Sequence, residues 1–108
     1  MLAAANISAE AGDTMLRLFL RDAPKRVAAL RDAIDARDAT ALGKAAHGLR
    51  SSAGTIGAAE LTQLLGSAES AAGAGDLETA SRDARGAIHA CEEACAYLEG
   101  LLMAESES

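Results

Sequence analysis

The chain has 108 residues and a formal net charge of −6, which suits a single domain with a modest hydrophobic core. An acidic domain of this size does not hold nucleic acid by neutralising phosphates, and no apolar run approaches the ~18 residues that would span a membrane. Half of the residues are hydrophobic but only 2% are aromatic. This composition favours helices over strands, with a core built from Leu, Ile, Val and Met.

Helical periodicity predicts four amphipathic helices in chain order. Their approximate ranges are 8–36, 39–55, 58–72 and 77–103. Pro24 lies inside the first range, so we expect a kink or a break near Asp22. Asp38 is a suitable N-cap for the second helix and Gly57 ends it, while the glycine-rich turn 73–76 separates the third helix from the fourth.

Short connections make consecutive helices antiparallel. We therefore expect an all-α, up-down antiparallel four-helix bundle, with room for a short extra helix at the N-terminus. It would be one domain over residues 1–108, with a core of about 8–103 and frayed termini. Residues 1–5 lack the basic segment of a signal peptide, so we expect a cytoplasmic location. We also expect the bundle to be a monomer. The predicted inward stripe of the second helix is Leu42, Ala45, Leu49, Ser52 and Ile56.

The second helix carries one histidine in a row of very small residues. At 100° per residue, Lys44 and Arg50 flank His47 at about 60° on either side, and Leu49 lies about 160° away. The small residues on the face of His47 are Gly43, Ser51 and Gly54. We therefore expect His47 to face solvent while the leucines face the core.

Each part of this face suits phosphoryl chemistry. A neutral imidazole is a good nucleophile near neutral pH. Phosphorylation adds nearly two negative charges, which Lys44 and Arg50 would partly offset. Helical glycines cost up to ~1 kcal/mol each relative to alanine, so Gly43, Gly48 and Gly54 need a reason, such as close approach of a partner or close helix packing. A solvent-facing histidine between two cations is also ordinary on protein surfaces, and the residues alone leave both interpretations open.

Residues 47–58 read His-Gly-Leu-Arg-Ser-Ser-Ala-Gly-Thr-Ile-Gly-Ala and precede the leucines of the third helix. This segment resembles the histidine phosphotransfer (HPt) domain family, whose motif is roughly His-x-Leu-Lys-Gly-Ser-(Ser/Ala)-x-x-(Leu/Ile/Phe)-Gly-Ala. Residues 18–30 are also similar to the first long helix of that family, so the resemblance covers about residues 13–72. Two positions depart from the motif: Arg50 replaces lysine and keeps the charge, and Ser51 replaces glycine with a small hydroxyl side chain.

The resemblance implies a phosphorelay carrier rather than an enzyme. His47 would accept a phosphoryl group, on Nε2, from an aspartate of a receiver domain and pass it to another receiver. The implied partners are response-regulator receiver domains and a hybrid sensor kinase. No cofactor is expected on this chain, and Mg²⁺ would belong to the receiver. The sequence has no Walker loop, kinase glycine boxes or acidic metal cluster, in keeping with a carrier that lacks an ATP site.

Helices two and three form a hairpin about Gly57, which should bring Glu69 close to His47. HPt domains commonly have an acidic residue at this position, and Glu69 would orient the ring through Nδ1; a solvated carboxylate without this bond is the alternative. The docking face predicted around His47 consists of Gly43, Ala46, Gly54 and Leu42. Ile7 and Met15 are further apolar candidates for this face.

Two other functions compete with the carrier. A P1-like substrate domain of a chemotaxis-type histidine kinase has a similar motif, including a run like the Gly-Thr-Ile-Gly of residues 54–57. A non-catalytic helical interaction module would make His47 incidental.

The two cysteines and the second histidine are interpreted as structural or surface residues. Cys91 and Cys95 lie one helical turn apart, which is poor disulfide geometry, so we expect two free, small core residues. His89 lies about 160° from Cys91 around the helix, so one metal ion does not easily bind both. We expect His89 to form a surface pair with Glu93.

Overall fold

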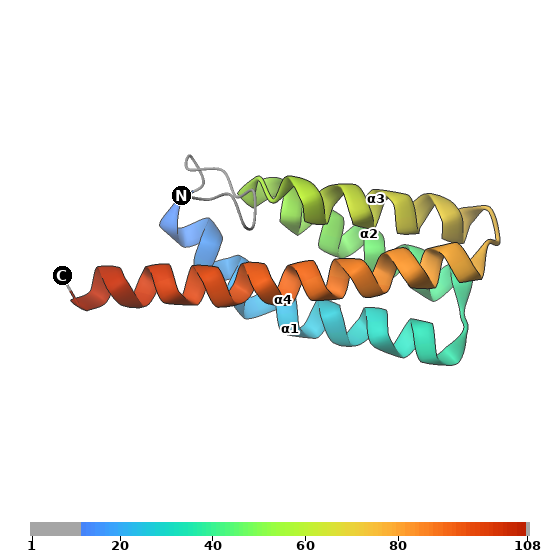
Figure 1. Cartoon of the computed structure of the whole chain (residues 1–108), viewed down its shortest axis with the longest axis horizontal. Coiled ribbons are helices and arrows are strands. Elements are labelled where there is room, and N and C mark those ends of the chain that lie inside the picture. The colour runs from blue at the N-terminus through green and yellow to red at the C-terminus, as the bar shows by residue number, and fades with distance from the viewer. Residues whose placement is uncertain (1–11, 108) are drawn as a thin grey trace.

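A computed structural model describes residues 12–107, with side chains described up to residue 104. It contains the helices α1 (Asp13–Ala36), α2 (Ala39–Ile56), α3 (Ala59–Gly73) and α4 (Leu77–Glu107). Figure 1 shows them running up and down in one elongated bundle. The predicted all-α antiparallel four-helix bundle is confirmed. The expected start at Ser8, the extra N-terminal helix and Ile7 lie outside the described residues.

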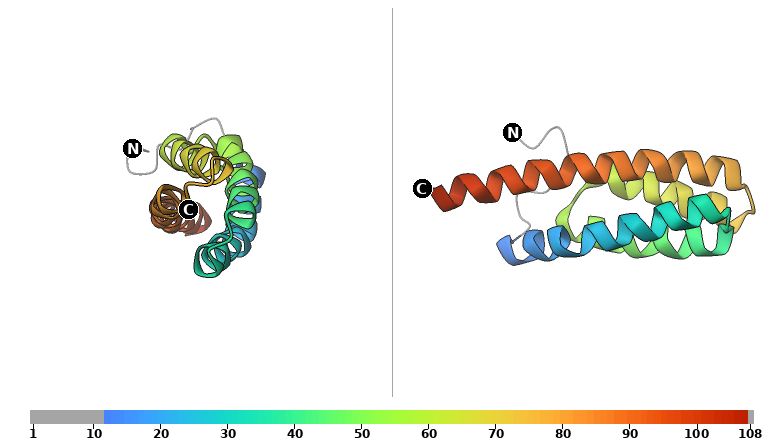
Figure 2. Two further views of the ribbon diagram at one scale, coloured as in Figure 1. Left: turned by 90° about the vertical axis from the view of Figure 1, so that its right-hand side faces the viewer. Right: turned by 90° about the horizontal axis from the view of Figure 1, so that it is seen from below.

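The helices form a ring in which each one packs against its sequence neighbours and α1 closes on α4. The view along the bundle axis in Figure 2 makes this arrangement visible. α4 has 31 residues and α3 has 15, so at 1.5 Å per residue they span about 46 Å and about 22 Å. α4 therefore extends well past the turn between α2 and α3 (Figure 1).

Leucine, isoleucine and alanine fill the core. The largest fully buried aliphatic side chains are Leu30, Leu42, Leu49, Ile56, Leu61, Leu65 and Leu98. Small alanines between them let the helix backbones approach closely. The prediction that Met contributes to the core is wrong for the described methionines. Met15 and Met103 are 45% and 65% exposed because they lie on helix faces that no neighbouring helix covers.

The helix ends follow local sequence signals. Asp38 caps α2, because its carboxylate accepts a hydrogen bond of 3.1 Å from the Ala41 N–H. Gly57 ends α2 with φ of 73°, a left-handed conformation that glycine adopts without steric cost. Of the kink or break predicted near Asp22, the break does not occur: α1 continues through Pro24 as one bent helix (Figure 1). Phe19 and Val27, buried on either side of the proline, hold both halves of α1 in one core.

The buried stripe of α2 differs from the predicted one by two residues. Ala46 and Ala53 are fully buried, whereas the predicted Ala45 and Ser52 are half-buried. The cause is the extensive packing of α2 against α3, which draws the buried stripe toward that neighbour. The centre of the stripe still lies about 140° around α2 from His47, which leaves the histidine on the outside.

Candidate functional site

His47 lies in the middle of α2 with 62% of its side chain exposed. The helix holds it there because Ala46 and Leu49, on the opposite side, have no exposed surface. The predicted solvent-facing position of His47 is thus confirmed.

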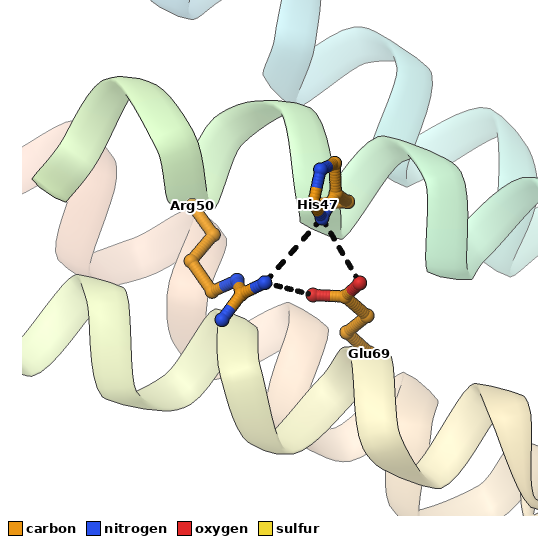
Figure 3. A network of polar contacts seen from close by, with 3 residues as sticks. All are labelled: His47, Arg50 and Glu69. Carbon is orange, nitrogen blue, oxygen red and sulfur yellow. Dashed lines mark hydrogen bonds and ion pairs between the residues drawn. The ribbon is translucent and has the colours of Figure 1, made fainter.

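Two side chains from two helices meet at the His47 ring (Figure 3). Glu69, on α3, places Oε2 3.0 Å from His47 Nδ1. Arg50, one turn beyond His47 on α2, places Nη2 3.0 Å from Glu69 Oε1. The predicted hairpin does bring Glu69 to His47, and only 31% of the Glu69 side chain is exposed. The carboxylate is therefore held from both sides.

The distances indicate which ring nitrogen of His47 carries the proton. Arg50 Nη2 lies 3.4 Å from Nδ1, farther than the 3.0 Å to the Glu69 carboxylate. Because a carboxylate only accepts hydrogen bonds, the shorter contact requires a proton on Nδ1. In a neutral imidazole this leaves Nε2 with its lone pair. Figure 3 shows that second nitrogen turned away from Glu69.

The surface beside His47 is bare. A methyl group at Gly43 would make only an ordinary contact, 3.5 Å from the Ala72 side chain, and one at Gly54 would meet no described atom within 4 Å. Ser51 is exposed on the same face. Packing inside the described part of the chain therefore does not require glycine at 43 or 54.

A shallow hollow adjoins the ring and reaches Lys44. Lys44, His47 and Glu69 all line it. Lys44 is exposed and makes no ion pair with any described residue. Its charge is therefore available on the His47 face, whereas the charge of Arg50 is shared with Glu69.

The docking prediction fails for its two apolar members. Leu42 and Ala46 have no exposed surface because α2 directs both into the core, so neither can contact a partner. Met15, a further predicted candidate, is 45% exposed, and it lines a hollow beside α2 together with Leu18, which is 40% exposed. Leu18 was missed, although apolar residues at 15, 16, 18, 19 and 20 are too many for one buried stripe.

The two cysteines are free, Cys91 buried and Cys95 half-buried. A hydrogen bond with Cys95, together with burial, raises the pKa of the Cys91 thiol above its usual range, and the same bond lowers the pKa of Cys95. This contact suits paired core residues.

The described residues contain no cluster of three or more potential metal ligands. Across the same part of the chain, each helix is too short or too polar to cross a membrane.

The fold and the site together define a helical domain that presents one oriented histidine. Residues 14–107 match the Hpt domain family, and the chain belongs to that family. Hpt domains take part in histidine phosphotransfer in two-component signalling and interact with receiver domains of response regulators. Comparison with curated proteins and with solved structures found no match.

Proposed function

We propose that this chain is a phosphoryl carrier in which His47 takes a phosphoryl group from the aspartate of one receiver domain and passes it to another. The contact between Nδ1 and Glu69 supports this most directly, because it leaves Nε2 unprotonated on an exposed, uncrowded face. Membership of the Hpt domain family supports the same role.

The transfer balances without moving a proton. The Nε2 lone pair of His47 attacks phosphorus, a P–N bond forms, and the P–O bond to the aspartate breaks, so the aspartate leaves as a carboxylate. The phosphorylated ring keeps its Nδ1 proton and becomes a cation. Glu69, 3.0 Å from Nδ1, stabilises that cation. Transfer to the second receiver is the same step in reverse.

Lys44 and Arg50 have different roles in balancing charge at the site. Arg50 holds the Glu69 carboxylate in place at 3.0 Å. Lys44, which lines the same hollow as His47, supplies positive charge for the phosphoryl oxygens. Ser51 adds a small hydroxyl on this face. The Mg²⁺ and the acidic residues that bind it belong, in this proposal, to the receiver.

The proposed docking face is the bare surface around His47, namely Gly43, Ser51 and Gly54, extended by the apolar pair Met15 and Leu18. The open positions leave room for a partner backbone, and the apolar pair offers surface to bury. One copy of the chain contains every residue that the proposal needs, so we propose that it acts as a monomer.

The test is phosphate transfer from a phosphorylated receiver. Receiver domains from the same genome are phosphorylated with acetyl phosphate and mixed with the wild-type chain or His47→Gln. Acid-labile, base-stable phosphate is then measured. We expect label on the wild type, none on the variant, and none from ATP alone. A P1-like domain would instead take label only from the ATP-binding domain of a kinase, and a non-catalytic module from neither source.

A further inference from the structure

A cleft between α1 and α2 lies beside the proposed phosphoryl site. It carries three cations and one carboxylate. The residues that matter in its lining are Asp22, Lys25, Arg26, Lys44 and Gly48. Lys44 also lines the hollow around His47, so the cleft and that hollow adjoin at Lys44.

Arg26 lies directly against the α2 backbone. A Cβ atom at Gly48 would stand 2.7 Å from Arg26 Nη1, closer than real Cβ contacts allow. Gly48 follows His47 in the chain, so the guanidinium of Arg26 passes α2 one residue from the histidine. Glycine at this position costs helix stability relative to alanine. What it provides in return is room for the Arg26 side chain.

The cations of this cleft lack partners within the described chain. The chain has 10 lysines and arginines against 16 acidic residues. The cations that do pair with a carboxylate are Arg17, Arg21, Arg31, Arg50 and Arg82. Lys25, Arg26 and Lys44 are not among them, and Arg26 Nε is buried without a hydrogen-bond partner in the described residues. Three unpaired cations against one carboxylate make the lining of this cleft complementary to an anionic group from outside.

We propose that Arg26, for which Gly48 leaves room beside α2, binds a carboxylate side chain of the receiver domain that docks on His47. This inference rests on the proposed function. A charge-assisted hydrogen bond from a guanidinium to a carboxylate is stronger than a neutral one, and Lys25 and Lys44 add positive charge around Arg26.

The surroundings of the cleft favour a protein carboxylate as its occupant. Asp22 lines both this cleft and the hollow that Met15 and Leu18 line, so the cationic cleft and an apolar surface adjoin at Asp22. A protein that covers His47 from outside can bury the apolar end and pair with the cationic end. Arg26 is therefore a positioning residue that selects acidic partners and orients them.

The experiment measures transfer from the phosphorylated receiver that labels the wild type fastest, at increasing concentrations of the chain. Arg26→Gln should raise the half-saturating concentration about tenfold and leave the limiting rate nearly unchanged, because it weakens docking and not the chemical step. The matched control is Arg82→Gln on α4, which removes the same charge from a pair with Asp83. Its half-saturating concentration and limiting rate should equal those of the wild type.

Gly48→Ala tests the geometry without touching a charge. The new methyl group displaces the flexible end of Arg26, so docking should weaken as in Arg26→Gln. The unfolding midpoint should not fall, since alanine favours the helix. The double variant should dock no worse than Arg26→Gln alone, because both changes remove the same contact.

The outcomes separate this inference from the function on which it rests. A wild type that takes no label overturns both. A labelled wild type with equal half-saturating concentrations for Arg26→Gln and Arg82→Gln overturns the carboxylate site alone. Weakening by Arg26→Gln without weakening by Gly48→Ala overturns the role of Gly48, and a loss confined to the limiting rate places Arg26 in the chemistry instead of docking.

Discussion

The two histidines of this chain are similar in exposure and differ in how they are held. His47 and His89 are 62% and 76% exposed, and each has a glutamate nearby, at 3.0 Å and 3.7 Å. Glu69 reaches His47 from another helix and is itself bound by Arg50. Glu93 lies one turn from His89 on the same helix and is 60% exposed. Exposed pairs of the second kind contribute little to stability or orientation.

The glutamates also contact different ring nitrogens. Glu69 holds Nδ1 of His47, whereas Glu93 approaches Nε2 of His89. His47 therefore presents Nε2, the nitrogen far from the backbone, whereas on His89 this is the nitrogen that the glutamate approaches. Exposure alone does not make a histidine a phosphoryl acceptor; what separates the two sites is a carboxylate fixed by tertiary structure on the correct side of the ring.

The largest expected difference comes from removing each ring. His47→Gln should lose all transferable phosphate, because the P–N bond has no other oriented nitrogen. His89→Gln should be labelled at the wild-type rate. Both are checked by counting acid-labile, base-stable phosphate after incubation with a phosphorylated receiver. Loss of label in both variants would mean that the comparison of the two sites is wrong.

Removing each glutamate is the next test. Glu69→Ala should slow phosphotransfer about tenfold, since a hydrogen bond to a charged group contributes about 1.5 kcal/mol. Glu93→Ala should have no effect. Nitrogen NMR gives a second measurement: the Nδ1-protonated form of His47 should lose population in Glu69→Ala, and the tautomers of His89 should not change in Glu93→Ala. A slower transfer with an unchanged His47 spectrum contradicts the orienting role of Glu69.

The fold could be predicted from the sequence because its signals are local. Leucines at helical spacing, the Asp38 cap and the Gly57 stop each depend on a few neighbouring residues, and all reappear in the structure. The pairing of Glu69 with His47 could also be predicted, since two helices joined at a short turn place residues at similar distances from the turn side by side.

Predictions that depended on how helices rotate against each other were less accurate. Periodicity locates a stripe only to within about one position: it places Ala45 inside and Ala46 on the docking face, whereas Ala46 is fully buried and Ala45 half-buried. Arg26 and Gly48 lie close together although they are 22 positions apart in the sequence and on different helices, and no local sequence pattern indicates this proximity. The docking prediction for Leu42 is wrong for a different reason. Leu42 belongs to the predicted inward stripe as well as to the predicted docking face, and these two positions exclude each other.

Arg50 should have a smaller effect than the glutamate that it holds. Arg50→Met removes the 3.0 Å contact with Glu69 Oε1, and transfer should slow about threefold because the carboxylate gains freedom but remains near the ring. The control is Arg31→Met, which breaks an exposed pair of 2.9 Å with Glu92 between α1 and α4. This control should transfer at the wild-type rate. Initial transfer rates at low and high salt measure both, and equal slowing would assign the effect to net charge.

An equally small difference is expected between two helical glycines at which there is room for a methyl group. Gly54 lies on the His47 face of α2 and Gly100 on α4, and a methyl group at either would meet no described atom within 4 Å. Both changes to alanine should therefore raise the free energy of unfolding by up to about 1 kcal/mol, measured by urea denaturation. Only Gly54→Ala should slow transfer, by about threefold, because its methyl group intrudes on the space that a docked receiver occupies. The two variants thus share a stabilising effect and differ in activity. Equal activities would mean that the bare face around His47 is not a docking surface.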